Sequence, residues 1–232
     1  PILGKADNIV DETNFSAISG TISANFGNDG PGTFGLSSFA ASGTLAGGVL
    51  TYHGVPVVVS LTSDGDVGTA GGVPVFTLTL DPATGDYTYN QIEPFDHADT
   101  ANPDDIINLT FGVTATDADG DQATTTITVH VHDDGPVAVN DGNSVVGSAN
   151  LTVNGNVTAN DNFGEDGPGH VTAVTFNGTT VTVPAVGTAT IVGQFGTLII
   201  SADGTYSYTS ANTALGTDNF TYTIVDYDGD PS

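Results

Sequence analysis

The sequence predicts an all-β protein, organised as two tandem immunoglobulin-like (Greek-key) β-sandwich modules. Three observations favour this fold: short runs of β-branched residues that alternate apolar with polar side chains, frequent turn signals with 31 Gly in 232 residues, and an internal repeat. No segment sustains the 3.6-residue periodicity of a helix. About seven short strands in roughly 100 residues is typical of the immunoglobulin-like sandwich, and a closed barrel is the alternative.

Three short motifs each occur twice, in the same order. In the first and second copy respectively they lie at 25–32 and 162–169 (NFG-N/E-DGPG), at 85–89 and 204–208 (GDYTY and GTYSY), and at 117–121 and 226–230 (DADGD and DYDGD). The shared order indicates duplication rather than chance. The spacing between copies shrinks along the chain, so copy one carries extra residues, including a loop at 93–105 rich in Asp, Pro and Asn.

Alternating apolar and polar residues place strands in both copies. The predicted strands are 73–80, 107–116 and 124–131 in the first copy, and 171–176, 197–201, 206–209 and 220–225 in the second. Pro136 ends the last strand of copy one, so we expect modules at 1–135 and 136–232.

The second copy has no counterpart of the strand predicted at 124–131. We expect either that the sequence ends within this module, or that the module is split and its remaining strand follows an inserted domain. An open strand edge would also invite pairing with another chain.

The charge balance excludes several classes of function. One basic residue, Lys5, stands against 27 acidic ones, which gives a net charge of −26. Such a surface repels nucleic acid and anionic lipid, and no run of about 18 apolar residues is present, so we expect neither partner and no membrane insertion. Only three acids are Glu, and the abundance of Asp indicates turns and metal ligands rather than general surface charge. Cysteine is absent, so core packing or metal must stabilise the fold.

The two DxDGD motifs are the strongest candidates for metal binding. Their alternating carboxylates can converge in a loop whose Gly permits a tight reversal, and their repulsion is costly without a cation. An EF-hand is excluded because the flanking segments predict strands rather than helices. We predict Ca²⁺ as the ion, because hard oxygen ligands suit it. The predicted ligands of these loops are Asp117, Asp119 and Asp121 in copy one and Asp226, Asp228 and Asp230 in copy two.

A second group of ligands is expected at the junction. A strand of about ten residues spans roughly 33 Å, so the first DxDGD motif and the pair Asp133 and Asp134 should lie at opposite ends of their module. The motif could share ions with the turn at Asp29, and the pair could share ions with Asp161 or Asp166 of copy two. An ion bound from both sides would stiffen two sandwiches that otherwise hinge freely.

Taken together, these motifs resemble the immunoglobulin-like repeats of giant type I-secreted RTX adhesins, in particular their type I secretion and cadherin-like modules. The matching segments are 117–121, 133–136, 160–161, 162–167 and 204–208, and the resemblance covers nearly the whole chain. It implies a β-sandwich, calcium at module junctions, and a place outside the bacterial cell. The glycine-rich nonapeptide repeats that name the family are absent.

The resemblance also implies a function. Such modules are extenders that position a ligand-binding tip for attachment and biofilm formation, and they fold on meeting external calcium. The expected partners are neighbouring modules of the same chain and, through the tip, a ligand on a host or biofilm surface; the chain is expected to be a monomer. Insertions in these adhesins can carry ligand-binding domains, so a split second module would lie close to the tip.

Two other functions are weaker. The extra loops of copy one, at 95–105, could form a calcium-dependent carbohydrate- or peptide-binding module, with Tyr52, Tyr87 and Tyr89 as stacking candidates. An enzyme is not expected, because no nucleophile elbow, phosphate loop or HExxH motif is present. Asp96-His97 suggests acid–base chemistry without an assignable partner, and His130 and His132 share the solvent face of a predicted strand.

Overall fold

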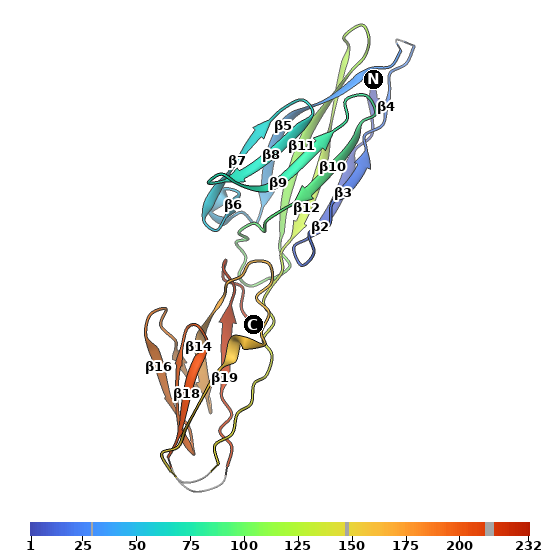
Figure 1. The fold of residues 1–232 in the computed structure, drawn as a ribbon. Helices are drawn as coiled ribbons and strands as arrows, with labels where there is room; N and C mark the ends of the chain where they lie inside the picture. The colour runs from blue at the N-terminus through green and yellow to red at the C-terminus, as the bar shows by residue number, and fades with distance from the viewer. Residues whose placement is uncertain (29, 147–148, 212–215) are drawn as a thin grey trace. The chain divides into compact units, whose positions relative to one another are not determined.

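A computed structural model describes residues 1–28, 30–146, 149–211 and 216–232 of the chain (Figure 1). The chain forms two compact units, Pro1–Asp134 (the first unit) and Gly135–Ser232 (the second unit). Each unit is built from sheets arranged as a sandwich, which confirms the predicted all-β fold class.

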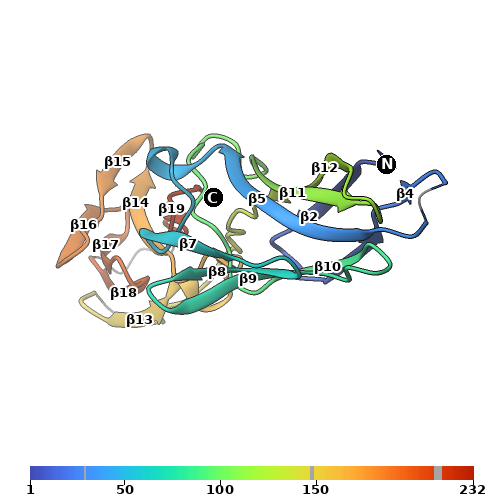
Figure 2. The same ribbon diagram turned by 90° about the horizontal axis from the view of Figure 1, so that it is seen from above.

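The first unit packs a four-stranded sheet on a six-stranded sheet, counted over its described residues. In spatial order, the smaller sheet holds β2 (Ala6–Asp11), β12 (Gln122–His132), β11 (Ile106–Thr116) and β5 (Thr33–Gly43). The larger holds β3 (Ile18–Thr21), β10 (Asp86–Gln91), β9 (Val73–Leu80), β8 (Gly65–Ala70), β7 (Val55–Leu61) and β6 (Thr51–Tyr52). A short pair, β1 (Ile2–Leu3) with β4 (Ala24–Asn25), and a 3₁₀ turn η1 (Ala46–Gly48) complete the unit. Figure 2 shows the two sheets as separate layers.

An aromatic core joins these layers. Phe76 on β9 has its ring 5.6 Å from that of Phe39 on β5 and 5.8 Å from that of Phe111 on β11. Phe76 and Phe111 are fully buried. Buried and partly exposed residues alternate along most of β11, so most of its apolar side chains face this core, and the same alternation predicted the strand from the sequence.

Strand pairing brings three chain segments to one end of the first sandwich. β2 runs parallel to β12, with Asp11 opposite His132, so both strands end side by side. β11 runs antiparallel to β12, with Ile106 opposite His132, so β11 begins at the same place. The 117–121 loop connects β11 to β12 at the far end, separated by the 11 residues of β12, as the sequence predicted.

The second unit has the same two-layer plan with fewer strands among its described residues. One sheet holds β13 (Thr152–Asn156), β18 (Thr205–Ser210), β17 (Gly196–Ser201) and β16 (Thr188–Val192); the other holds β15 (Thr179–Thr182), β14 (His170–Phe176) and β19 (Thr221–Val225). A 3₁₀ turn η2 (Val157–Ala159) follows β13. Phe220 packs its ring 5.1 Å from Phe176 and 6.2 Å from Tyr208, between the layers.

The chain folds back along β19 after the 226–230 loop. Ile224 and Ser232 exchange two backbone hydrogen bonds of 3.0 Å, and Val225 forms a bridge with Pro231. β19, the 226–230 loop and the returning chain therefore follow one another in the same order as β11, the 117–121 loop and β12 in the first unit. Whether a further full strand pairs with β19 stays a prediction.

Candidate metal centres

The 117–121 loop is closed by its own backbone. The N–H of Asp117 donates to the carbonyl of Asp121 at 3.0 Å, and the N–H of Asp121 donates to Asp117 Oδ1 at 2.7 Å. Gly120 has a φ of 99°, a conformation that only Gly adopts without strain. The closed loop places one carboxylate oxygen each of Asp117, Asp119 and Asp121 within 4.8 Å of one another.

The 226–230 loop repeats this structure. The N–H of Asp226 donates to the carbonyl of Asp230 at 3.2 Å, and the N–H of Asp230 donates to Asp226 Oδ1 at 2.7 Å. Gly229 has a φ of 115°. Asp226, Asp228 and Asp230 again offer oxygens within 4.8 Å of one another. The two copies of the motif therefore form loops with the same backbone hydrogen bonds and the same convergence of carboxylates.

The NFG-x-DGPG turn packs against the DxDGD loop in the second unit. A Cβ on Gly169 would lie 2.1 Å from the Phe163 ring and 2.2 Å from the Val225 carbonyl, so Gly is required for this close approach. The turn carries Asp166, whose carbonyl accepts from the N–H of Tyr227 at 3.2 Å. Carboxylate oxygens of Asp166 and of Asp228 in the loop lie within 4.8 Å. Two repeated motifs thus supply one acidic site.

In the first unit the same packing recurs around Gly32. A Cβ there would lie 2.3 Å from both the Phe26 ring and the Thr116 carbonyl, one residue before the loop. Asp29, the predicted ligand on this turn, lies outside the described residues.

The electrostatics of the two loops differ. Burial raises the pKa of the Asp226 carboxyl, and the charge of Asp230 adds to this, although nearby hydrogen bonds offset part of it. At Asp117 burial also acts to raise the pKa, but the hydrogen bonds with Asp119 and with the N–H of Asp121 outweigh it, so the pKa lies below its ordinary value. The second unit contains no Lys or Arg, so no side-chain cation of its own balances its buried acids.

Asp161 has a different role from the loop carboxylates. Its Oδ1 accepts from the N–H of Val139 at 2.7 Å and from the Tyr222 hydroxyl at 3.1 Å. Burial, the hydrogen bond to Asp141 and the charge of Asp161 hold the pKa of the Tyr222 phenol well above its ordinary range. Within the described residues Asp161 belongs to no group of three converging ligands. Through these hydrogen bonds its carboxylate links the segment at Val139 to β19.

Asp133 and Asp134 follow β12 directly. The N–H of Asp133 donates to the carbonyl of Asp105 at 3.1 Å, and the N–H of Asp134 donates to Asp133 Oδ1 at 2.9 Å. Both residues are buried. An ion shared between this pair and the second unit stays a prediction.

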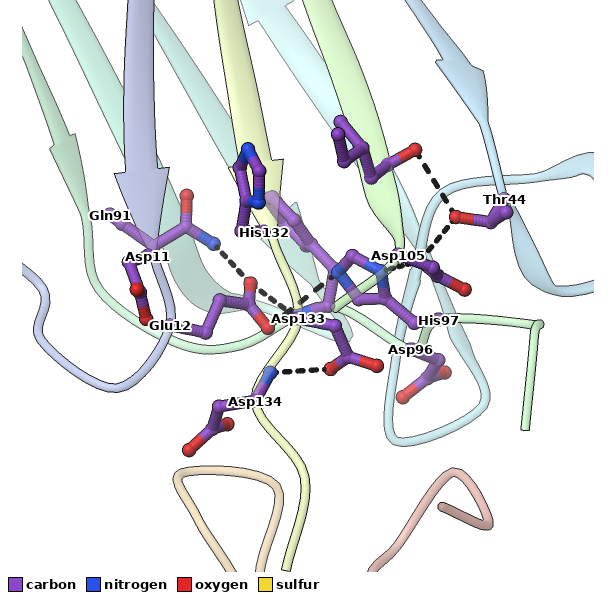
Figure 3. A network of polar contacts seen from close by, with 12 residues as sticks. Asp11, Glu12, Thr44, Gln91, Asp96, His97, Asp105, His132, Asp133 and Asp134 are labelled. Atoms are coloured by element: carbon purple, nitrogen blue, oxygen red, sulfur yellow. Dashed lines mark hydrogen bonds and ion pairs between the residues drawn. The ribbon is translucent and has the colours of Figure 1, made fainter. Parts of the chain in front are cut away.

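Beside Asp133 lies a cluster that the sequence did not predict (Figure 3). Glu12 follows β2, and its Oε1 accepts from the N–H of Phe95 at 3.1 Å. His97 contacts Asp105 through Nδ1, and its Nε2 lies 3.7 Å from Glu12 Oε2. Glu12, His97 and Asp133 each offer a ligand atom within 4.8 Å of the others. The available signals were the rarity of Glu and the Asp96-His97 pair in a loop of copy one.

The predicted binding loop at 95–105 is buried at its two ends and exposed between them, at 98–104. Phe95, Asp96, His97 and Asp105 are all buried, and the Asp96 carboxylate accepts the N–H groups of His53 and Gly54 at 2.7 Å each.

The prediction of Tyr87 and Tyr89 as stacking candidates was wrong. Their exposed fractions are 4% and 0%, because both side chains point into the sandwich core from β10. Tyr52 is half-buried, and its hydroxyl donates to Glu93 at 3.1 Å. Of the three predicted stacking candidates, Tyr52 alone lies outside the buried core, and a carbohydrate-binding face stays a prediction.

His130 and His132 have separate partners. His130 Nε2 lies 2.7 Å from Asp7, and His132 Nδ1 lies 2.8 Å from Asp104. These contacts favour the interpretation of polar strand residues over that of a metal-binding pair.

The matches to known families follow the two compact units of the fold. Residues 7–130, more than half of the chain, match a family described as a domain of unknown function (DUF5801). The chain belongs to the DUF5801 family. Beyond the DUF5801 domain, residues 133–232 match a bacterial Ig domain. No match was found among curated proteins.

The Ig match places the chain in a broad class. Bacterial Ig domains are usually extracellular or surface-exposed, and this all-β fold is typically structural rather than enzymatic. In the described parts of this DUF5801 protein no helix has the length and apolar character needed to cross a membrane.

Proposed function

We propose that the chain is a calcium-stiffened extender segment of a bacterial cell-surface adhesin, which positions a ligand-binding tip for attachment and biofilm formation. The observation that carries this proposal is the DxDGD loop, formed twice with the same backbone hydrogen bonds and with three carboxylates converging each time. Ca²⁺ prefers six to eight oxygen ligands, and each of these loops supplies three carboxylates.

Charge gives the proposal its physical basis. The chain holds 27 acids and one Lys or Arg, so carboxylates that converge have almost no side-chain cation to offset them. A bound dication removes this repulsion, and it stabilises only the folded state because the ligands converge only there. The resemblance to type I-secreted modules suits this, since the chain would stay unfolded in low cytosolic calcium.

Stiffness depends on an ion at the junction. In this proposal Asp133 and Asp134 supply ligands from the first unit and Asp166 supplies them from the second. Asp166 is preferred to Asp161, because Asp161 is held by Val139 and Tyr222 while Asp166 lies against the 226–230 loop. Domains joined by a short linker hinge by default, and a shared ion would fix their angle.

Titration calorimetry tests the calcium sites. Chelator-treated protein should bind Ca²⁺ with dissociation constants of about 0.1–1 mM, the range of extracellular modules. The variant Asp226→Asn with Asp228→Asn should lose part of the heat, while Asp203→Asn, in an ordinary turn of the second unit, should not. Absence of any calcium-dependent heat in the wild type would remove the basis of the proposal.

X-ray scattering tests the stiffening. We expect a rigid extended particle with calcium and a more flexible one with chelator. Asp134→Asn should make the calcium-loaded protein resemble the chelated wild type, whereas Asp104→Asn, whose side chain is 75% exposed, should have no effect. Identical wild-type profiles in calcium and in chelator would contradict a junctional ion.

A further inference from the structure

The cluster at the end of β2 and β12 differs in chemistry from the calcium loops, because a histidine lies among its carboxylates (Figure 3). The side chains of His97 and Glu12 are 1% and 0% exposed, and that of Asp105 is 2% exposed. With Asp133 they gather three carboxylates around one imidazole within the first unit. We propose that Glu12, His97 and Asp133 bind a transition-metal dication of the zinc or manganese class.

The charge of the cluster favours a bound cation. Lys5 is the only Lys or Arg of the whole chain, and it is exposed on the surface. Removing several carboxylates from water is costly unless an opposite charge accompanies them. Glu12, Asp105 and Asp133 bring three carboxyl groups together here, and a dication among them would offset their negative charge.

The imidazole is oriented for metal binding. Asp105 Oδ2 accepts from the N–H of Asp99 at 2.9 Å, and its Oδ1 contacts both the Thr44 hydroxyl and His97 Nδ1. This fixed carboxylate holds the proton on Nδ1, so Nε2 presents its lone pair towards Glu12. A carboxylate behind a ligating histidine is the usual outer-shell partner at zinc sites.

The spacing of the ligand atoms also fits a metal ion. His97 Nε2 and Glu12 Oε2 are 3.7 Å apart, which is longer than a hydrogen bond. Bond lengths of about 2.0–2.2 Å put two ligands of a tetrahedral zinc ion roughly 3.4 Å apart. Small side-chain shifts therefore bring the atoms into coordination range. Water can supply the fourth position.

The nitrogen ligand decides the class of metal. Calcium and magnesium take oxygen ligands, whereas imidazole with carboxylates suits zinc, manganese and related ions. The ion would join the end of β2, the connection between β10 and β11, and the end of β12. In a chain without cysteine, such a site would serve as the cross-link that a disulfide provides elsewhere.

This proposal does not depend on calcium binding at the loops. Asp133 can contribute one oxygen to this site and the other to a junctional ion, because a carboxylate can bridge two cations. The test is therefore made in saturating Ca²⁺, which occupies the oxygen-only sites and leaves the mixed site to the added metal.

The experiment is a zinc titration of chelator-treated, calcium-reloaded protein. We expect one further site per chain, bound at least tenfold more tightly than calcium. His97→Asn should abolish it, because Asn keeps a donor towards Asp105 but loses Nε2. The matched control is His132→Asn on the neighbouring strand end, which should bind zinc like the wild type (Figure 3).

Two measurements guard against a variant that fails to fold. Glu12→Gln keeps an acceptor for the N–H of Phe95 and should weaken zinc binding at least tenfold. Cobalt added to the wild type should give the visible absorption of a nitrogen- and oxygen-ligated, low-coordination site. No zinc heat in the calcium-loaded wild type, or full zinc binding by a folded His97→Asn variant, would overturn the proposal.

Discussion

The two ends of β12 carry carboxylate clusters of opposite character. Before the strand, the 117–121 loop keeps Asp119 and Asp121 exposed and offers only oxygen ligands. After the strand, Asp133 meets Glu12 and His97, and the latter two are enclosed in protein. An ion bound at the first end would be open to solvent, whereas one bound between Glu12 and His97 would be enclosed.

This difference shows that acidity alone does not define a metal site. Exposed carboxylates are hydrated and screened by salt, so their repulsion is weaker and they bind calcium weakly and reversibly. Enclosed carboxylates repel in a medium of low dielectric constant and need a permanent partner. The strand connects a candidate calcium site at one end to a candidate site for a structural metal at the other.

The largest effect should come from calcium at the two DxDGD loops. Adding Ca²⁺ at about 100 times its dissociation constant stabilises the folded state by about 2.7 kcal/mol for each site. Differential scanning calorimetry of chelated and calcium-loaded protein should show a rise of many degrees in the melting temperature. Asp119→Asn with Asp121→Asn should reduce the rise for the first unit. An unchanged melting temperature in the wild type would refute calcium stabilisation at both loops.

The enclosed end should respond in opposite directions to one substitution. In metal-free buffer Glu12→Gln removes a buried charge and should stabilise the first unit by roughly 1–2 kcal/mol in urea unfolding. With zinc present, the same variant should be less stable than the wild type, because it has lost a ligand. Glu93→Gln is the control, since Glu93 is half-buried outside the cluster. Destabilisation by Glu12→Gln in both buffers would indicate a purely structural hydrogen-bonding role.

Local patterns predicted much of the fold. The strand predicted at 73–80 coincides with β9, and that predicted at 107–116 lies within one residue of β11. The alternation of a strand that is buried on one face is visible along the chain. The strand β5 (Thr33–Gly43) was not predicted, because its Gly and Ser residues interrupt the alternation of apolar and polar side chains. Its pairing with β11 in the folded sheet defines it instead.

The candidate sites also differ in whether a local sequence pattern could predict them. The DxDGD loops were predictable, because all three carboxylates and the required Gly lie within five residues. The cluster of Glu12, His97 and Asp133 draws on three distant segments, and the parallel pairing of β2 with β12 brings them together. No local pattern records that pairing. The sheet topology is therefore needed to show that Glu12 and His97 are neighbours.

One buried acid lies outside both clusters, so it allows the effect of burial on stability to be tested apart from metal binding. Asp66 on β8 is fully buried and, among the described residues, belongs to no group of converging ligands. Burial raises the pKa of Asp66 above its ordinary 3.8, and the backbone N–H of Thr62 offsets only part of this. A raised folded-state pKa means that the stability from this group is complete below pH 3.8 and is lost as pH rises through the folded-state pKa.

Asp66→Asn should therefore raise the free energy of unfolding at pH 7 by about 1 kcal/mol and flatten its decline between about pH 4 and pH 7. Urea unfolding of the first unit, followed by circular dichroism across this range, makes the comparison. Asp64→Asn, in the exposed turn before β8, should change stability little. Because Asp66 belongs to no group of three converging ligands among the described residues, zinc should leave the effect of Asp66→Asn unchanged. A zinc-dependent effect would show that burial of the first unit's acids, rather than the geometry at His97, governs its response to metal.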